Sequence, residues 1–133
     1  MAATKVLDAY ALMAYFEDEP GADLVRSLLL RAEEGGIKLA MSVVNLGEVW
    51  YAIARAESPE KADRIIQVIQ GMAIELVDVD WNLTRQAAGF KARAKISYAD
   101  CFTAALAKQR RAEIVTGDQE FNQLQNELKI TWL

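Results

Sequence analysis

The sequence contains no histidine and a single cysteine, Cys101. These absences exclude serine–histidine and cysteine–histidine nucleophiles, histidine general bases, and zinc sites built from histidine or thiolate. One cysteine also cannot form a disulfide within the chain, which fits a reducing cytoplasm. Any catalysis must therefore use carboxylates, lysine, hydroxyl groups or a metal ion held by oxygen ligands.

Long apolar runs and targeting signals are also missing. The most apolar stretch, residues 39–54, is interrupted by Asn45 and Glu48, so we expect no membrane span. The opening MAATKV is too short and too polar for a signal peptide. No glycine-rich phosphate loop supports nucleotide binding. With 133 residues, 53% apolar and 26% charged, the chain is expected to form one cytoplasmic domain over residues 1–133.

Short apolar runs alternate with segments of helical periodicity along the whole chain. Strands are predicted over 4–7, 37–41, 74–79, 113–116 and 130–133. Helices are predicted over 9–16, 22–33, 43–56, 59–70, 81–95, 98–111 and 119–124. This order predicts an α/β domain with a mainly parallel central sheet of four to five strands and helices on both faces.

Four acidic residues are expected at one edge of this sheet. Asp8 follows the first strand and Asp118 follows the fourth, while Glu48 and Asp100 lie in helices attached to that edge. In open α/β sheets, ligands bind outside the carboxyl ends of the strands. All four carboxylates can therefore reach the same site.

Each acid also has a simpler explanation. Asp8 and Asp118 suit helix N-caps, and Asp100, three residues after Ser97, suits a capping box. Glu48 lies off the apolar stripe of its helix, as an exposed acid would. The site hypothesis therefore depends on the four acids acting together.

Carboxylates that share one site repel each other. At 4 Å, two unit charges cost about 1 kcal/mol in water and about 4 kcal/mol at an effective dielectric of 20. Such a cluster requires altered protonation or bound cations. Oxygen ligands without histidine or thiolate select Mg²⁺ or Mn²⁺ over zinc.

The formal net charge of −4 hides an asymmetry along the chain. Residues 1–80 carry 7 basic and 14 acidic side chains, whereas residues 81–133 carry 8 basic and 5 acidic. Between Trp81 and Arg111 the only acid is Asp100. This basic surplus could attract a polyanion or form a solvated helix face.

Four segments carry a resemblance to a known family: VLDAYAL, SVVNLGEVWYA, ISYADCFTAALA and IVTGDQEF. They resemble the PIN-domain family, and more closely the VapC-type toxins of bacterial and archaeal toxin–antitoxin pairs. The resemblance covers essentially the whole chain, including the closing ITWL. It implies a metal site with supporting polar groups. Its acids would be Asp8, Glu48, Asp100 and Asp118; Thr116 matches the family's hydroxyl, and Asn45 lies one turn before Glu48.

The resemblance implies Mg²⁺- or Mn²⁺-dependent endonucleolytic cleavage of RNA. A water activated by metal would attack phosphorus in line, leaving 5′-phosphate and 3′-hydroxyl ends. Arg85, Lys91, Arg93 and Lys95 would hold RNA phosphates beside the site. A cognate antitoxin is the implied partner, and a homodimer is expected. Four aromatic residues of the first half could serve either interface or belong to the core: Tyr10, Tyr15, Trp50 and Tyr51.

Two other interpretations stay open. A non-catalytic receiver-like module could bind one Mg²⁺, but it needs an acid pair after the first strand, and Ala9 follows Asp8. It also needs a lysine at the end of the last strand, where Thr131 and Trp132 stand. A PIN-like fold used only for protein binding is the other, and the retention of four acids argues against it.

Overall fold

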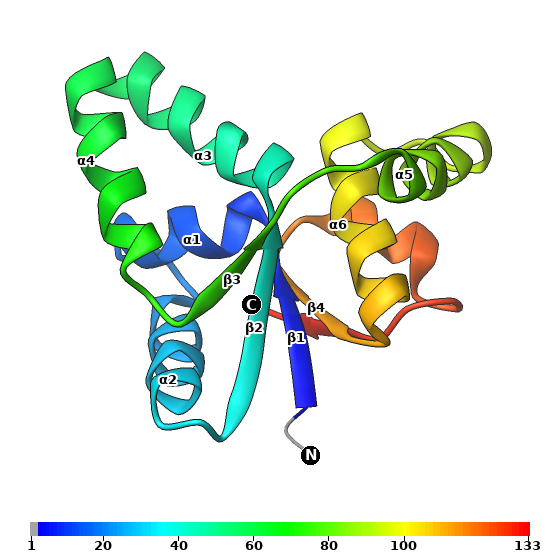
Figure 1. Ribbon diagram of the computed structural model, residues 1–133, viewed down its shortest axis with the longest axis horizontal. Helices are drawn as coiled ribbons and strands as arrows, with labels where there is room; N and C mark the ends of the chain where they lie inside the picture. Colours follow the sequence, from blue (N-terminus) through cyan, green and yellow to red (C-terminus); the bar gives the residue numbers. More distant parts are fainter. Residues whose placement is uncertain (1–2) are drawn as a thin grey trace.

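The computed structural model describes residues 3–133, whose five strands form one sheet in which every pairing is parallel (Figure 1). The strand order is β3-β2-β1-β4-β5. The strands are β1 (Ala3–Leu7), β2 (Ile37–Ser42), β3 (Ile74–Val77), β4 (Glu113–Thr116) and β5 (Ile130–Trp132). This confirms the predicted α/β fold class with a parallel central sheet.

Helices cover both faces of the sheet, as predicted. One side carries α1 (Ala9–Phe16), α2 (Ala22–Glu33), α3 (Val43–Ala56) and α4 (Pro59–Gln70) (Figure 1). The other side carries α5 (Trp81–Arg93), α6 (Tyr98–Arg110) and the 3₁₀ helix η1 (Gln119–Leu124). This division follows because the crossovers from β1 through β2 to β3 run along the sheet in one direction, and those from β3 to β4 and β5 run in the other.

The sheet separates two apolar cores. Successive strand residues point to opposite faces, so Val6 packs with Phe90 and Phe121 under α5 and α6, whereas Leu7 packs with Leu12 among α1 to α4. A parallel sheet covered on both faces requires strands that are apolar on both sides. The run Val6–Leu7, with no exposed surface, meets this requirement.

The helix α6 is the most extensively buried helix of the described residues. Every residue from Asp100 to Ala107 is buried, and most have small side chains. The helix packs against α5, α3 and the strands β1 and β2. Small residues allow this close approach, which holds the first turn of α6, with Asp100, at the carboxyl edge of the sheet.

Hydrogen-bonding caps fix where the helices begin. The side chains of Asp8, Ser42 and Ser97 each accept a bond from the backbone N–H three residues later. Ser58 and Asp80 do the same for α4 and α5. The N-cap predicted for Asp8 is therefore present, and so is the start of the box predicted for Ser97.

Two predicted boundaries are wrong by two residues. The strand predicted over 74–79 ends at Val77, because its last partner is Ser42, after which β2 becomes a helix. The helix predicted over 81–95 ends at Arg93, because the backbone of Lys95 is bonded at both its N–H and its C=O by the Gln123 amide. Within residues 3–133, no helix is both long and apolar enough to span a membrane.

Candidate metal centre

Four acidic side chains line one cavity of about 290 Å³ at the carboxyl edge of the sheet: Asp8, Glu48, Asp100 and Asp118. Asp8 directly follows β1, and Asp118 follows β4, the neighbouring parallel strand. The strand order reverses between β1 and β4, which is where open α/β sheets form their binding crevice. The structure thus brings together all four acids that the sequence singled out.

Asp8 is held by two hydrogen bonds and is nearly inaccessible to solvent. One carboxylate oxygen accepts from the Ala11 N–H at 2.9 Å, and the other accepts from the Thr116 hydroxyl. Burial raises the pKa of Asp8 to about 7, although both hydrogen bonds act to lower it. The Thr116 hydroxyl oxygen also accepts from the Asp118 N–H at 2.9 Å, so Thr116 connects the two acids.

Asn45 fixes Glu48 and joins two helices at the cavity. Its buried amide donates to the Glu48 carboxylate at 2.9 Å and to the Ala99 carbonyl at 3.0 Å, so it links α3 to α6 next to Asp100. Its amide oxygen accepts from the Ser42 hydroxyl at 2.6 Å. Burial raises the pKa of Glu48, and the bond from Asn45 partly offsets that rise.

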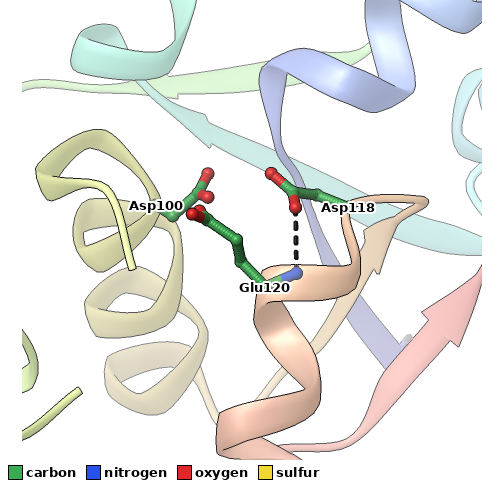
Figure 2. A group of neighbouring side chains, drawn as sticks. All are labelled: Asp100, Asp118 and Glu120. Atoms are coloured by element: carbon green, nitrogen blue, oxygen red, sulfur yellow. Dashed lines mark hydrogen bonds between the residues drawn. The ribbon is translucent and has the colours of Figure 1, made fainter. Parts of the chain in front are cut away.

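A fifth acid, Glu120, belongs to the same cluster. Asp100, Asp118 and Glu120 each offer one carboxylate oxygen, and these oxygens lie within 4.8 Å of one another (Figure 2). Asp118 accepts from the Glu120 N–H at 2.9 Å, and Glu120 accepts from the Ser97 N–H at 3.3 Å. Burial, followed by the neighbouring Glu120 and Asp118 carboxyls, raises the pKa of Asp100 to about 9.

Sequence reasoning missed Glu120. It lies two residues after Asp118, in a segment whose helical character gave no expected direction for its side chain. In the structure, η1 is a 3₁₀ helix that turns this side chain back toward α6, as Figure 2 shows. Its proximity to a strand-end acid was the available signal.

The donor set fits a hard divalent cation. The cavity offers carboxylate oxygens on several elements, and the chain has no histidine to compete with them. Burial and the neighbouring Glu120 and Asp118 carboxyls raise the pKa of Asp100, as expected where acids crowd together. A cation such as Mg²⁺ or Mn²⁺ would relieve this repulsion. Asp8 and Glu48 line the cavity, while Asp100, Asp118 and Glu120 each offer an oxygen within 4.8 Å of the other two.

Two of the four basic residues expected to contact RNA share a surface. Arg85 and Arg93, which lie about two turns apart on α5, line a cavity of about 180 Å³ with Lys108. Arg93 is partly neutralised by Glu127, at 2.8 Å, and its guanidinium lies 4.3 Å from the centre of the Phe90 ring.

The other two basic residues lie apart from that surface. Lys91 donates to the Ile96 carbonyl at 2.7 Å, and Lys95 is exposed on the loop between α5 and α6. Within residues 3–133, neither these lysines nor the two arginines line the acidic cavity.

The family model of the PIN domain matches residues 5–127, and the chain belongs to that family. No curated protein matches the sequence. Among solved structures, VapBC2 from Rickettsia felis, bound to a DNA fragment from its promoter, has a TM-score of 0.78 and 18% identity over 98% of each chain.

Two structures from Mycobacterium tuberculosis are also similar. VapC20, described as a sarcin–ricin loop cleaving toxin, has a TM-score of 0.71 and 16% identity over 90% of this chain and 93% of that one. VapBC-5, from the VapBC family of toxin–antitoxin systems, has a TM-score of 0.62 and 20% identity over 98% of each chain. At these identities the likeness shows a shared fold.

Proposed function

We propose that the protein is a Mg²⁺- or Mn²⁺-dependent endoribonuclease that acts as the toxin of a toxin–antitoxin pair. The observation that carries this proposal is the convergence of Asp8, Glu48, Asp100 and Asp118 in one cavity of a PIN domain. A similar fold in a toxin described as cleaving the sarcin–ricin loop supports it.

The cavity acids would hold the cation, with Asp100 and Asp118 best placed because their oxygens lie close together. When bound, a divalent cation lowers the pKa of water and stabilises charge on a phosphodiester. Thr116 orients Asp8, and Asn45 orients Glu48. With water as the nucleophile no histidine pair would be required, and the products would end in 5′-phosphate and 3′-hydroxyl. Ends bearing a 2′,3′-cyclic phosphate would contradict this mechanism.

RNA binding next to an acidic cavity requires positive charge elsewhere on the surface. Arg85 and Arg93 share one such surface with Lys108, and the exposed Lys91 and Lys95 add charge at the end of α5. These residues would hold phosphates of the bound strand, while the bound cations offset the charge of the acids.

The proposed partners are a cognate antitoxin and a second copy of the chain, in the cytoplasm. Similar folds in structures of VapBC toxin–antitoxin proteins support an antitoxin partner. Sedimentation of the purified protein, alone and after co-expression with the proposed antitoxin, tests both associations. A monomer that does not change its sedimentation would contradict both.

The decisive experiment is cleavage of a panel of structured RNAs by protein free of any partner. Mg²⁺, Mn²⁺ and EDTA are compared for the wild type and for the Asp8→Asn and Asp100→Asn variants. Asp23→Asn is the matched control, because this acid is exposed on α2. We expect cleavage that requires metal, is lost in both site variants and is kept in the control. Metal-independent cleavage by the variants would contradict the proposal, and metal binding without cleavage of any RNA would favour the receiver-like module.

A further inference from the structure

Two half-exposed tyrosines form part of the wall of the acidic cavity. Tyr10 on α1 is 43% exposed and Tyr51 on α3 is 45% exposed, and both line the cavity with the four acids. The other two aromatics that the sequence singled out for an interface, Tyr15 and Trp50, pack against the core beneath α1 to α4. The cavity thus presents aromatic surface to solvent beside its carboxylates.

The Tyr10 ring lies against the turn that carries Asp118. A Cβ atom on Gly117 would lie 2.3 Å from Cε1 of the Tyr10 ring, closer than atoms can approach. Only the absence of a side chain at Gly117 lets the ring lie against this turn, between Thr116 and Asp118. The ring is therefore held at the edge of the site by the residues that form the site.

One face of α3 continues from the cavity outward. Glu48, Tyr51, Ala52 and Arg55 are spaced by three and four residues, so they lie on one face of the helix. Glu48, Tyr51 and Ala52 line the cavity, and the exposed Arg55 places its guanidinium 5.0 Å from the centre of the Tyr51 ring. From Glu48 to Arg55 the helix rises about 10 Å. An acid, an aromatic ring and a cation thus follow one another away from the site.

This order matches the chemistry of an unpaired nucleotide chain. Bases that are not in a duplex stack on exposed aromatic side chains and on arginine, and an arginine also binds phosphate. Bases inside a duplex offer no free face, so such a wall selects unpaired strands. Stacking also supplies attraction beside a cavity whose carboxylates repel phosphate.

We propose that Tyr10 and Tyr51 stack the unpaired bases on either side of the scissile phosphate, and that Arg55 binds a phosphate farther along the strand. This inference rests on the proposed nuclease function and names three residues of this chain that would position an unpaired strand, Tyr10, Tyr51 and Arg55. A protein partner that covers the same rings is the competing occupant, and the experiment below distinguishes the two.

The test uses a short single-stranded oligoribonucleotide carrying 2-aminopurine, whose fluorescence falls when the base stacks. Binding is measured in EDTA, where metal-dependent cleavage cannot occur, and again in Mg²⁺. Tyr10→Leu and Tyr51→Leu remove one ring each, and Tyr10→Phe and Tyr51→Phe keep it. Trp81→Leu is the matched control, because this aromatic is 73% exposed on α5 and does not line the cavity.

We expect each leucine variant to bind the oligonucleotide about 5- to 140-fold more weakly, the range that stacking of one base spans. The 2-aminopurine quenching should disappear in the leucine variants and persist in the phenylalanine variants and in Trp81→Leu. Duplex RNA should compete less well than single-stranded RNA for the wild type. Mn²⁺ affinity should stay unchanged, which separates loss of a ring from damage to the acids.

A further variant tests whether RNA binding depends on the position of the Tyr10 ring against Gly117. Gly117→Ala keeps every aromatic but forces the Tyr10 ring to move, so it should weaken binding as Tyr10→Leu does while urea unfolding shows a folded protein. Gly47→Ala, on exposed α3 surface with open space around the added Cβ, should leave binding unchanged.

Three results would overturn the stacking role. These are equal binding and quenching in wild type and leucine variants, equal losses in phenylalanine and leucine variants, or loss of antitoxin binding with RNA binding intact. The readout does not depend on cleavage. A wild type that cleaves no RNA contradicts the proposed nuclease, whereas unchanged fluorescence in the leucine variants contradicts this inference.

Discussion

At the level of single residues, Asp8 is a buried carboxyl whose ionisation opposes folding. Its pKa is about 7 in the folded protein, against 3.8 for an unperturbed aspartate, because burial disfavours the charged form. The folded state therefore keeps its proton while the unfolded state loses it. Between about pH 4 and pH 7 this group makes the metal-free protein progressively less stable, by at most about 4 kcal/mol, and above pH 7 the loss is complete.

Urea unfolding of metal-free wild type and Asp8→Asn at a series of pH values measures this effect. The variant should match the wild type near pH 4 and become more stable than it as the pH rises to about 7. Comparison with the variant removes the contribution of other groups, such as Glu113, whose pKa is lowered by its bond from Lys5. Saturating Mg²⁺ should stabilise the wild type more than the variant. A stability difference that does not change with pH would contradict the assignment.

Asn45 gives a second prediction at this scale. Replacing it by alanine removes the donor to the Ala99 carbonyl and to the Glu48 carboxylate, at a partly buried contact between α3 and α6. We expect Asn45→Ala to lower the free energy of unfolding by about 2 to 4 kcal/mol, since each buried group left unpaired costs about 1–3 kcal/mol. Urea unfolding checks this.

The matched control for Asn45 is Asn82→Ala, at an exposed position of α5, which should change stability by no more than about 0.5 kcal/mol. Asn45→Ala should also weaken Mn²⁺ binding, because Glu48 loses its orientation. Wild-type stability in Asn45→Ala would show that the three hydrogen bonds of this amide contribute nothing net.

The acids at strand ends were predictable from the sequence, but the residues that surround them were not. Asp8 and Asp118 were predicted because a strand end fixes where a side chain lies relative to the sheet. The bond from Asn45 to Ala99 joins positions 54 residues apart, and it depends on how α3 packs on α6. Glu120 depends on the path of a 3₁₀ turn, which periodicity does not specify. Whether these acids bind metal stays a prediction.

At the level of elements, α6 is the helix around which the domain closes. Ala104 has no exposed surface and lies in a helix that packs on α5, α3 and the sheet. Ala104→Leu adds volume where no space is left, so we expect a loss of about 1–3 kcal/mol in the free energy of unfolding. Ala92→Leu, at an exposed position of α5, is the control, because leucine and alanine have similar helix propensities.

Thermal or urea unfolding of these two variants measures the difference. Similar stabilities would mean that α6 can move away from the sheet at little cost. In that case the position of Asp100, in the first turn of the same helix, would not be fixed by packing.

Element types were predictable from the sequence, and several ends were not. Asp8, Ser42 and Ser97 mark helix starts by local chemistry, so these boundaries agree with the structure. The ends at Val77 and Arg93 depend on a neighbouring strand and on a distant glutamine. Local sequence does not indicate such partners, which are distant along the chain.

For the whole molecule, strand order decides which acids meet. Parallel pairing of β1 with β4 sets Leu7 beside Val115, so Asp8 and Thr116 follow in neighbouring positions and the Asp8–Thr116 hydrogen bond forms. The sequence predicted a parallel sheet but did not specify this order. The predicted topology alone left open whether the four acids meet in one site, and the resemblance of four segments to PIN domains predicted that they do.

Charge separation across the molecule leads to a final prediction. RNA that contacts α5 should bind more weakly as salt rises, and each lost phosphate contact should reduce the slope of log K against log salt by about 0.7 to 1. Arg85→Ala should show this reduction. Arg93→Ala should show less, because Glu127 at 2.8 Å already neutralises part of its charge. Arg31→Ala, an exposed residue of α2 on the opposite side of the sheet, should leave the slope unchanged.

Fluorescence anisotropy of a labelled single-stranded RNA over a range of salt concentrations gives the slopes. Equal slopes for all three variants would place the RNA away from α5, and the bound strand would then have to follow the tyrosines and Arg55 of α3 alone.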